Sequence, residues 1–127
     1  MTNTSKRPLA GITVLIAEDY WLLADLIRLA VSDAGGKVVG PTGSLAEAER
    51  LAAAGCFDAV VMDINLRGGH ADALAMRLAD LGKKVIVLTG YEPSPQLVAS
   101  IHQYLAKPVP TDVLIAALAR PLTNRRD

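Results

Sequence analysis

The chain has 127 residues, of which 51% are hydrophobic, and its 13 basic side chains balance its 13 acidic ones. A domain of this size can bury a core, and the composition argues against a disordered protein. The balanced charge offers no basic field to nucleic acid or to an anionic membrane. The single Cys56 excludes an internal disulfide framework. No apolar run approaches the ~18 residues that a transmembrane helix needs. The N-terminal segment lacks the apolar stretch of a signal peptide, so we expect a soluble cytoplasmic protein.

Short apolar segments alternate with longer segments of helical periodicity. Continuous runs such as ITVLIA at 12–17 are typical of parallel strands that are buried on both faces. Apolar residues three and four apart predict helices, such as the one that begins at Trp21 and is terminated by Gly35. In chain order, we predict a strand at 12–17, a helix at 21–35, a strand at 37–40, a helix at 45–55, a strand at 58–62, a loop at 64–70, a helix at 71–82, a strand at 83–88, a helix at 96–102, a strand at 103–106 and a helix at 112–120.

Several boundaries are predicted from single residues. Pro41 closes the second strand, and Ser44 with Glu47 has the spacing of a capping box for the second helix. Thr111 is the predicted N-cap of the last helix. The segment 64–70 contains two adjacent glycines and is predicted to be a flexible loop.

The alternation of strands and helices predicts an α/β fold, with a doubly wound five-stranded parallel sheet and helices on both faces. No linker or repeat divides the chain, so we expect one domain at 11–122 with tails at 1–10 and 123–127. Because the last predicted helix ends close to the C-terminus, we expect the domain to stand alone, without an output domain.

Polar residues follow four of the predicted strands: Glu18 and Asp19 the first, Asp63 the third, Thr89 the fourth and Lys107 the fifth. The carboxyl ends of parallel strands meet at one edge of an open sheet, where ligands bind. Clustered carboxylates repel one another unless a cation neutralises them, and Mg²⁺ prefers oxygen ligands. An Asp carboxylate can attack phosphorus while a lysine and a hydroxyl stabilise the phosphoryl oxygens. The pattern favours phosphoryl transfer to Asp63 at a Mg²⁺ site.

Four motifs, in this order, make the chain resemble the receiver domain of two-component response regulators, a CheY-like, flavodoxin-like fold. They are AED at 17–19, VMDINL at 61–66, LTG at 88–90 and YLAKP at 104–108, and the resemblance covers essentially the whole chain. It implies a signalling phosphoacceptor rather than an enzyme. Such a protein takes phosphate from a histidine kinase or a histidine phosphotransfer protein, with Mg²⁺ as cofactor.

The resemblance assigns a role to each matching position, with Asp63 as the phosphoacceptor. The implied Mg²⁺ ligands are the carboxylates of Glu18, Asp19 and Asp63 and the backbone carbonyl of Asn65. The implied phosphate-binding and switch residues are Thr89, Gly90, Lys107 and the aromatic Tyr104. The Lys107–Pro108 peptide bond is expected to be cis. Asn65 and Tyr91 flank the phosphate and are candidates for tuning the rate of dephosphorylation.

The segment from Thr89 to Lys107 departs from most receivers. It is a few residues shorter, and Pro93 and Pro95 stand where the fourth helix normally begins. It resembles an atypical subgroup with a Phe-Ala-Thr-Gly-Tyr signature, although valine and leucine replace the first two residues here. We therefore expect a short fourth helix at 96–102, mobile or ordered only on phosphorylation.

Several alternatives remain open at the level of sequence. A receiver can switch its contacts with an unknown downstream protein, act as a phosphate sink or shuttle in a phosphorelay, or serve as an unphosphorylated pseudo-receiver scaffold, as a monomer or a homodimer. A haloacid-dehalogenase-like phosphatase needs a second carboxylate where Asn65 stands, and a flavin-binding module of flavodoxin type would not present the acidic AEDYW to a phosphate.

Some of these residues also have a purely structural interpretation. Glu18 and Asp19 can cap the first helix, and Tyr104 can be a packing residue. Tyr20 and Trp21 are expected to pack at the start of the first helix, or one of them to face a partner.

Overall fold

The computed structural model describes residues 7–90, 95, 97, 101 and 103–121. Five strands form one parallel sheet in the order β2-β1-β3-β6-β7, which confirms the predicted doubly wound fold. These strands are β1 (Thr13–Ala17), β2 (Lys37–Thr42), β3 (Ala59–Asp63), β6 (Lys84–Thr89) and β7 (Gln103–Ala106). The helices are α1 (Trp21–Asp33), α2 (Leu45–Ala54), α3 (Asp72–Asp80) and α5 (Thr111–Ala119).

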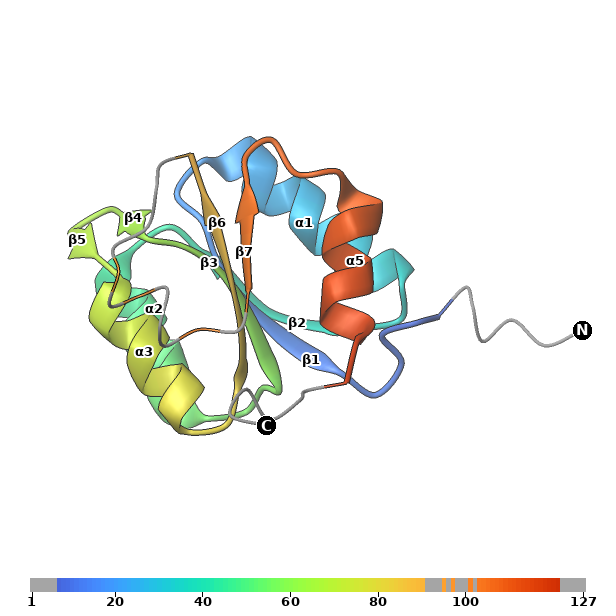
Figure 1. Ribbon diagram of the computed structural model, residues 1–127, viewed down its shortest axis with the longest axis horizontal. Helices are drawn as coiled ribbons and strands as arrows, with labels where there is room; N and C mark the ends of the chain where they lie inside the picture. The colour runs from blue at the N-terminus through green and yellow to red at the C-terminus, as the bar shows by residue number, and fades with distance from the viewer. Residues whose placement is uncertain (1–6, 91–94, 96, 98–100, 102, 122–127) are drawn as a thin grey trace, which may run out of the picture.

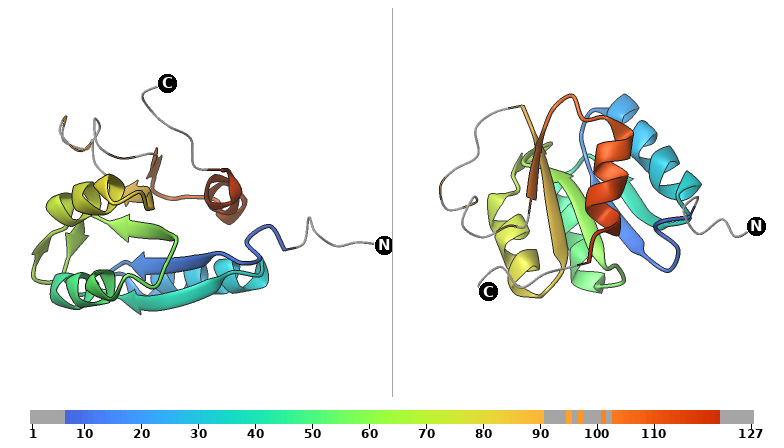
Figure 2. Two further views of the ribbon diagram at one scale, coloured as in Figure 1. Left: turned by 90° about the horizontal axis from the view of Figure 1, so that it is seen from below. Right: turned by 45° about the vertical axis from the view of Figure 1, so that its right-hand side comes forward.

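The sheet is the middle layer, with α1 and α5 on one face and α2 and α3 on the other (Figures 1 and 2). Alternate residues of a strand point to opposite faces. In β1, Leu15 therefore packs in the core cluster under α2 and α3, whereas Val14 and Ile16 pack in the cluster under α1 and α5. Since both faces of the central strands are buried, these strands read in sequence as continuous apolar runs.

The second strand is longer than predicted. β2 continues past Pro41 to Thr42. The register of its pairing with β1 shifts between Leu15 and Ala17, because β2 contains one more residue there than β1 does. In the described part of the chain, β2 lies at the edge of the sheet and pairs with β1 alone. A proline is tolerated there because an edge strand needs backbone donors on one side only, so the prediction that Pro41 closes the strand was wrong.

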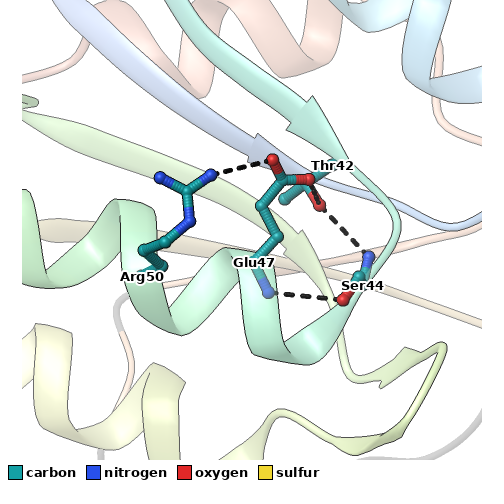
Figure 3. A network of polar contacts seen from close by, with 4 residues as sticks. All are labelled: Thr42, Ser44, Glu47 and Arg50. Carbon is teal, nitrogen blue, oxygen red and sulfur yellow. Dashed lines mark hydrogen bonds and ion pairs between the residues drawn. The ribbon is translucent and has the colours of Figure 1, made fainter.

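The start of α2 confirms half of the predicted capping box. The Ser44 hydroxyl accepts a hydrogen bond from the Glu47 backbone N–H at 3.3 Å. The Glu47 carboxylate does not return to Ser44 but accepts from the Thr42 hydroxyl at 2.8 Å, and Thr42 accepts from the Ser44 N–H at 3.2 Å (Figure 3). Arg50 completes the network by donating to Glu47 at 3.0 Å. Thr42 thus ties the end of β2 to α2.

Three further boundaries differ from the predictions or lie outside the described residues. The predicted loop at 64–70 contains an antiparallel pair, β4 (Asn65–Leu66) and β5 (Gly69–His70). Thr111 is the first residue of α5 and not its N-cap, which is Pro110. Most of the predicted helix at 96–102 lies outside the described residues.

The described part of the chain contains no helix that is long and apolar enough to span a bilayer.

Candidate functional site

The carboxyl ends of β1, β3, β6 and β7 lie at one end of the sheet (Figure 1). Parallel strands place their carboxyl ends together, and the register pairs Asp63 with Leu88, directly before Thr89. Glu18 and Thr89 are buried, with 3% and 8% of their surfaces exposed, and Asp63 is 9% exposed. The predicted strand-end residues therefore meet in one largely buried site.

Lys107 connects two of the carboxylates. Its Nζ donates to Asp63 Oδ2 at 2.7 Å and lies 2.9 Å from Glu18 Oε1. Burial alone would lower the pKa of Lys107, but the hydrogen bonds and charges of Asp63 and Glu18 outweigh burial and raise it. Burial raises the pKa of Glu18, and Lys107 opposes this effect. The ammonium is thus held charged between two carboxylates.

Backbone donors orient the same carboxylates. The Asn65 N–H donates to Asp63 Oδ1 at 3.1 Å, and the Tyr20 N–H donates to Glu18 Oε2 at 3.0 Å. Tyr20 is the N-cap residue of α1 and makes no side-chain cap. Glu18 therefore belongs to the site and also accepts a backbone hydrogen bond at the start of α1. This agrees in part with the interpretation of Glu18 as a cap of the first helix.

Glu18, Asp19 and Asp63 can each offer one carboxylate oxygen within 4.8 Å of the other two. Three carboxylates against one ammonium leave a net charge of about two negative units at the site, which a divalent cation would neutralise. Oxygen donors, partial burial and one exposed member, Asp19, suit a hard cation that keeps some of its water. The residues present thus fit Mg²⁺.

β6 and β7 carry the remaining predicted residues. The Lys107 N–H donates to the Thr89 carbonyl at 2.9 Å, and the Lys107–Pro108 peptide bond is cis, as expected. Gly90 follows Thr89, and a Cβ atom added to it would meet none of the described residues within 4 Å. Tyr104 is half-buried on β7 and packs against the core cluster under α2 and α3. Tyr91 lies outside the described residues.

The structure also assigns neighbours that the sequence did not indicate. A cavity of about 350 Å³ opens beside the acidic pair, and its lining includes Trp21, Thr42, Gly43 and Arg67. Tyr20 and Trp21 are 56% and 72% exposed, which contradicts the expectation that they pack at the start of the helix, whereas the alternative that one of them faces a partner stays a prediction. No pattern in the sequence pointed to this cavity, because its lining comes from three separate segments.

A sequence model of the response regulator receiver domain matches residues 14–119. No curated protein matches the sequence significantly.

Among solved structures, a Burkholderia pseudomallei response regulator crystallised with a phosphorylated aspartic acid, a calcium ion and citrate is 28% identical, with a TM-score of 0.75. The match covers 85% of this chain but only 66% of that one.

The signal receiver domain of a modulated diguanylate cyclase from Desulfovibrio desulfuricans G20 is 30% identical, with a TM-score of 0.71 and coverage of 84% and 90%. A CheY-like receiver from Methanospirillum hungatei JF-1 shares the fold at 23% identity, with a TM-score of 0.75 and coverage of 87% and 90%.

Proposed function

Since the chain belongs to the response regulator receiver family, we propose that it accepts a phosphoryl group on Asp63 in a Mg²⁺-dependent reaction and thereby switches its protein contacts. The observation that carries the proposal is the contact of Lys107 with both Asp63 and Glu18, inside a cluster of three convergent carboxylates. Membership of this family sets aside the phosphatase and the flavin-binding module.

In the proposed reaction, one carboxylate oxygen of Asp63 forms a bond to phosphorus while the bond from phosphorus to the leaving group breaks. The leaving group departs with the electron pair of that bond, and an acyl phosphate remains on Asp63. Glu18, Asp19, Asp63 and the Asn65 carbonyl are the proposed holders of Mg²⁺. When bound, Mg²⁺ supplies positive charge to the phosphoryl oxygens.

The remaining site residues have proposed roles after transfer. Lys107 already donates a hydrogen bond to the Asp63 carboxylate. After transfer, its ammonium is proposed to contact the negatively charged phosphoryl oxygens on Asp63. The Thr89 hydroxyl and the space at Gly90 are proposed to receive the phosphoryl oxygens. Tyr104 is the proposed aromatic switch, and Asn65 and Tyr91 are proposed to tune dephosphorylation. Phosphorylation is thus proposed to shift the population of the protein between two states of the site.

The proposed phosphate source is a histidine kinase or a histidine phosphotransfer protein. An apolar surface beside the site supports a docked partner, because Leu22, Leu26 and Leu29 are spaced as one face of α1 and are 41%, 49% and 44% exposed. Trp21 extends this surface toward Asp19. The downstream partner is an unknown protein. The same phosphorylation chemistry would serve a homodimer, or a protein that acts as a phosphate sink or shuttle in a phosphorelay.

The test is intact-mass measurement after incubation with Mg²⁺ and acetyl phosphate. We expect one phosphoryl adduct on the wild type and on Asp33→Ala, an exposed carboxylate on α1. Asp63→Ala and samples with EDTA should show none. An adduct that persists in Asp63→Ala would place the acceptor elsewhere. A wild type that binds Mg²⁺ but is never labelled would favour the pseudo-receiver scaffold.

A further inference from the structure

Arg67 is held at the rim of the site by its backbone. Its N–H donates to the Gly43 carbonyl at 2.9 Å, and its carbonyl accepts from the Leu45 N–H at 2.9 Å. Arg67 links β4 to β5, so the segment predicted as a flexible loop is fastened to the connection between β2 and α2. The base of the Arg67 side chain therefore has a defined position.

The side chain turns back over Gly43. A Cβ atom added to Gly43 would stand 2.5 Å from Arg67 Nη1 and 3.0 Å from the α-carbon of Asp19. The guanidinium and the Asp19 backbone are thus both close to one position, which a glycine leaves empty. This arrangement places a full positive charge near the backbone of Asp19, a residue of the proposed Mg²⁺ site.

Arg67 is the one basic residue in the described lining of the cavity of about 350 Å³, which also contains Asp19, Asp25 and Trp21. Asp25 is paired with Arg28 at 2.6 Å, on the helix itself. Among the described residues, Arg67 has no carboxylate partner within ion-pair distance, and its side chain is exposed. Its charge is available to whatever enters the cavity.

We propose that Arg67 recruits the anionic phosphodonor to the site and, with the same charge, weakens the binding of Mg²⁺. This inference rests on the proposed phosphoryl transfer to Asp63. Three carboxylates against Lys107 make the site negative, which repels a phosphate ester or acyl phosphate that approaches from solvent. A positive charge at the rim offsets this repulsion. The same guanidinium repels a divalent cation that binds at Asp19.

The two effects of one charge have opposite signs, which separates them from a structural role. Arg67→Gln should tighten Mg²⁺ binding by roughly two- to fourfold, the size expected for a screened, solvent-exposed charge. The same variant should slow phosphorylation by acetyl phosphate at saturating Mg²⁺ by roughly three- to tenfold. Arg67→Lys should restore both values toward wild type. Lys37→Gln removes an exposed charge at the other end of the sheet and should change neither.

The Mg²⁺ affinity is measured by titrating the protein with Mg²⁺ and following the fluorescence of Trp21, which lines the same cavity. The phosphorylation rate is measured by intact mass at a subsaturating concentration of acetyl phosphate. Loss of both Mg²⁺ affinity and rate in Arg67→Gln, or failure of Arg67→Lys to restore them, would show that Arg67 only supports the fold. Values equal to wild type would also overturn the inference. A wild type that is never labelled would overturn the proposed function and the donor half of the inference, whereas the Mg²⁺ titration decides the other half independently.

Discussion

Replacing Lys107 with methionine removes the one ammonium between two carboxylates and keeps a side chain of similar length. Lys107 lies 2.7 Å from Asp63 and 2.9 Å from Glu18, whose side chains are 13% and 1% exposed. In the variant, Glu18 and Asp63 face each other without a counter-charge. The folded state should therefore lose stability at neutral pH when Mg²⁺ is absent.

The expected loss lies between two limits. Breaking a fully buried ion pair costs about 3–5 kcal/mol, because a buried charge is left uncompensated. An exposed pair contributes about 0–1 kcal/mol. The Lys107 side chain is 25% exposed, so we expect about 1–3 kcal/mol, or roughly 3–10 °C in the melting temperature of a domain of this size.

The pH dependence has a definite sign. Burial raises the pKa of Glu18, and Lys107 lowers it, so the pKa should rise further in Lys107→Met. A carboxyl whose pKa is raised in the folded state stabilises that state below its unfolded pKa, and this stability is lost as the pH rises through the folded value. Protonation of Glu18 therefore relieves the variant in acid, and the difference from wild type should shrink from pH 7.5 to pH 5.

Thermal unfolding by circular dichroism at both pH values, with and without Mg²⁺, is the assay. Mg²⁺ should stabilise Lys107→Met more than the wild type, because the cation replaces the lost positive charge. Lys37→Met, which removes an exposed lysine at the start of β2, is the matched control and should melt like the wild type. A Lys107→Met protein that melts like the wild type at pH 7.5, or whose deficit grows in acid, would refute this account of the site.

Two predictions concern the scaffold. Thr42→Val should destabilise the protein by about 1–2 kcal/mol in urea unfolding, because it removes the hydroxyl that bridges Glu47 and the Ser44 N–H; an unchanged unfolding midpoint would mean that α2 is capped without it. Lys84→Met should cost about 1–2 kcal/mol in the same assay, because the Lys84 ammonium donates to three carbonyls at the C-terminal end of α5. Wild-type stability in that variant would show that these contacts contribute nothing.

The sequence alone predicted the fold class and the site at the ends of the strands. Apolar runs at 12–17 and 83–88 are long enough to identify strands that are buried on both faces. In a parallel sheet, the carboxyl ends of all strands lie at one edge. The position of a residue at the end of a strand can therefore be predicted from the sequence alone. Asp63 and Lys107 meet for this reason, although 44 positions separate them in the chain.

Details that depend on contacts between distant segments required the tertiary structure. Pro41 looked like the end of a strand, and only its place at the edge of the sheet shows why β2 continues. The antiparallel pair β4–β5 is stabilised partly by the backbone around Gly43, which no local pattern in 64–70 reveals. Local propensity is a property of a few residues, whereas these hydrogen bonds exist only after the layers have packed.

The same distinction applies to charge. The sequence determined which ionisable groups exist and, through the parallel sheet, that Glu18, Asp63 and Lys107 share one site. Only the packed structure decided that one ammonium serves two carboxylates and that Arg67 lies over Gly43 beside Asp19. Electrostatic energy depends on distance and burial, and both are set by the folded arrangement rather than by the order of residues.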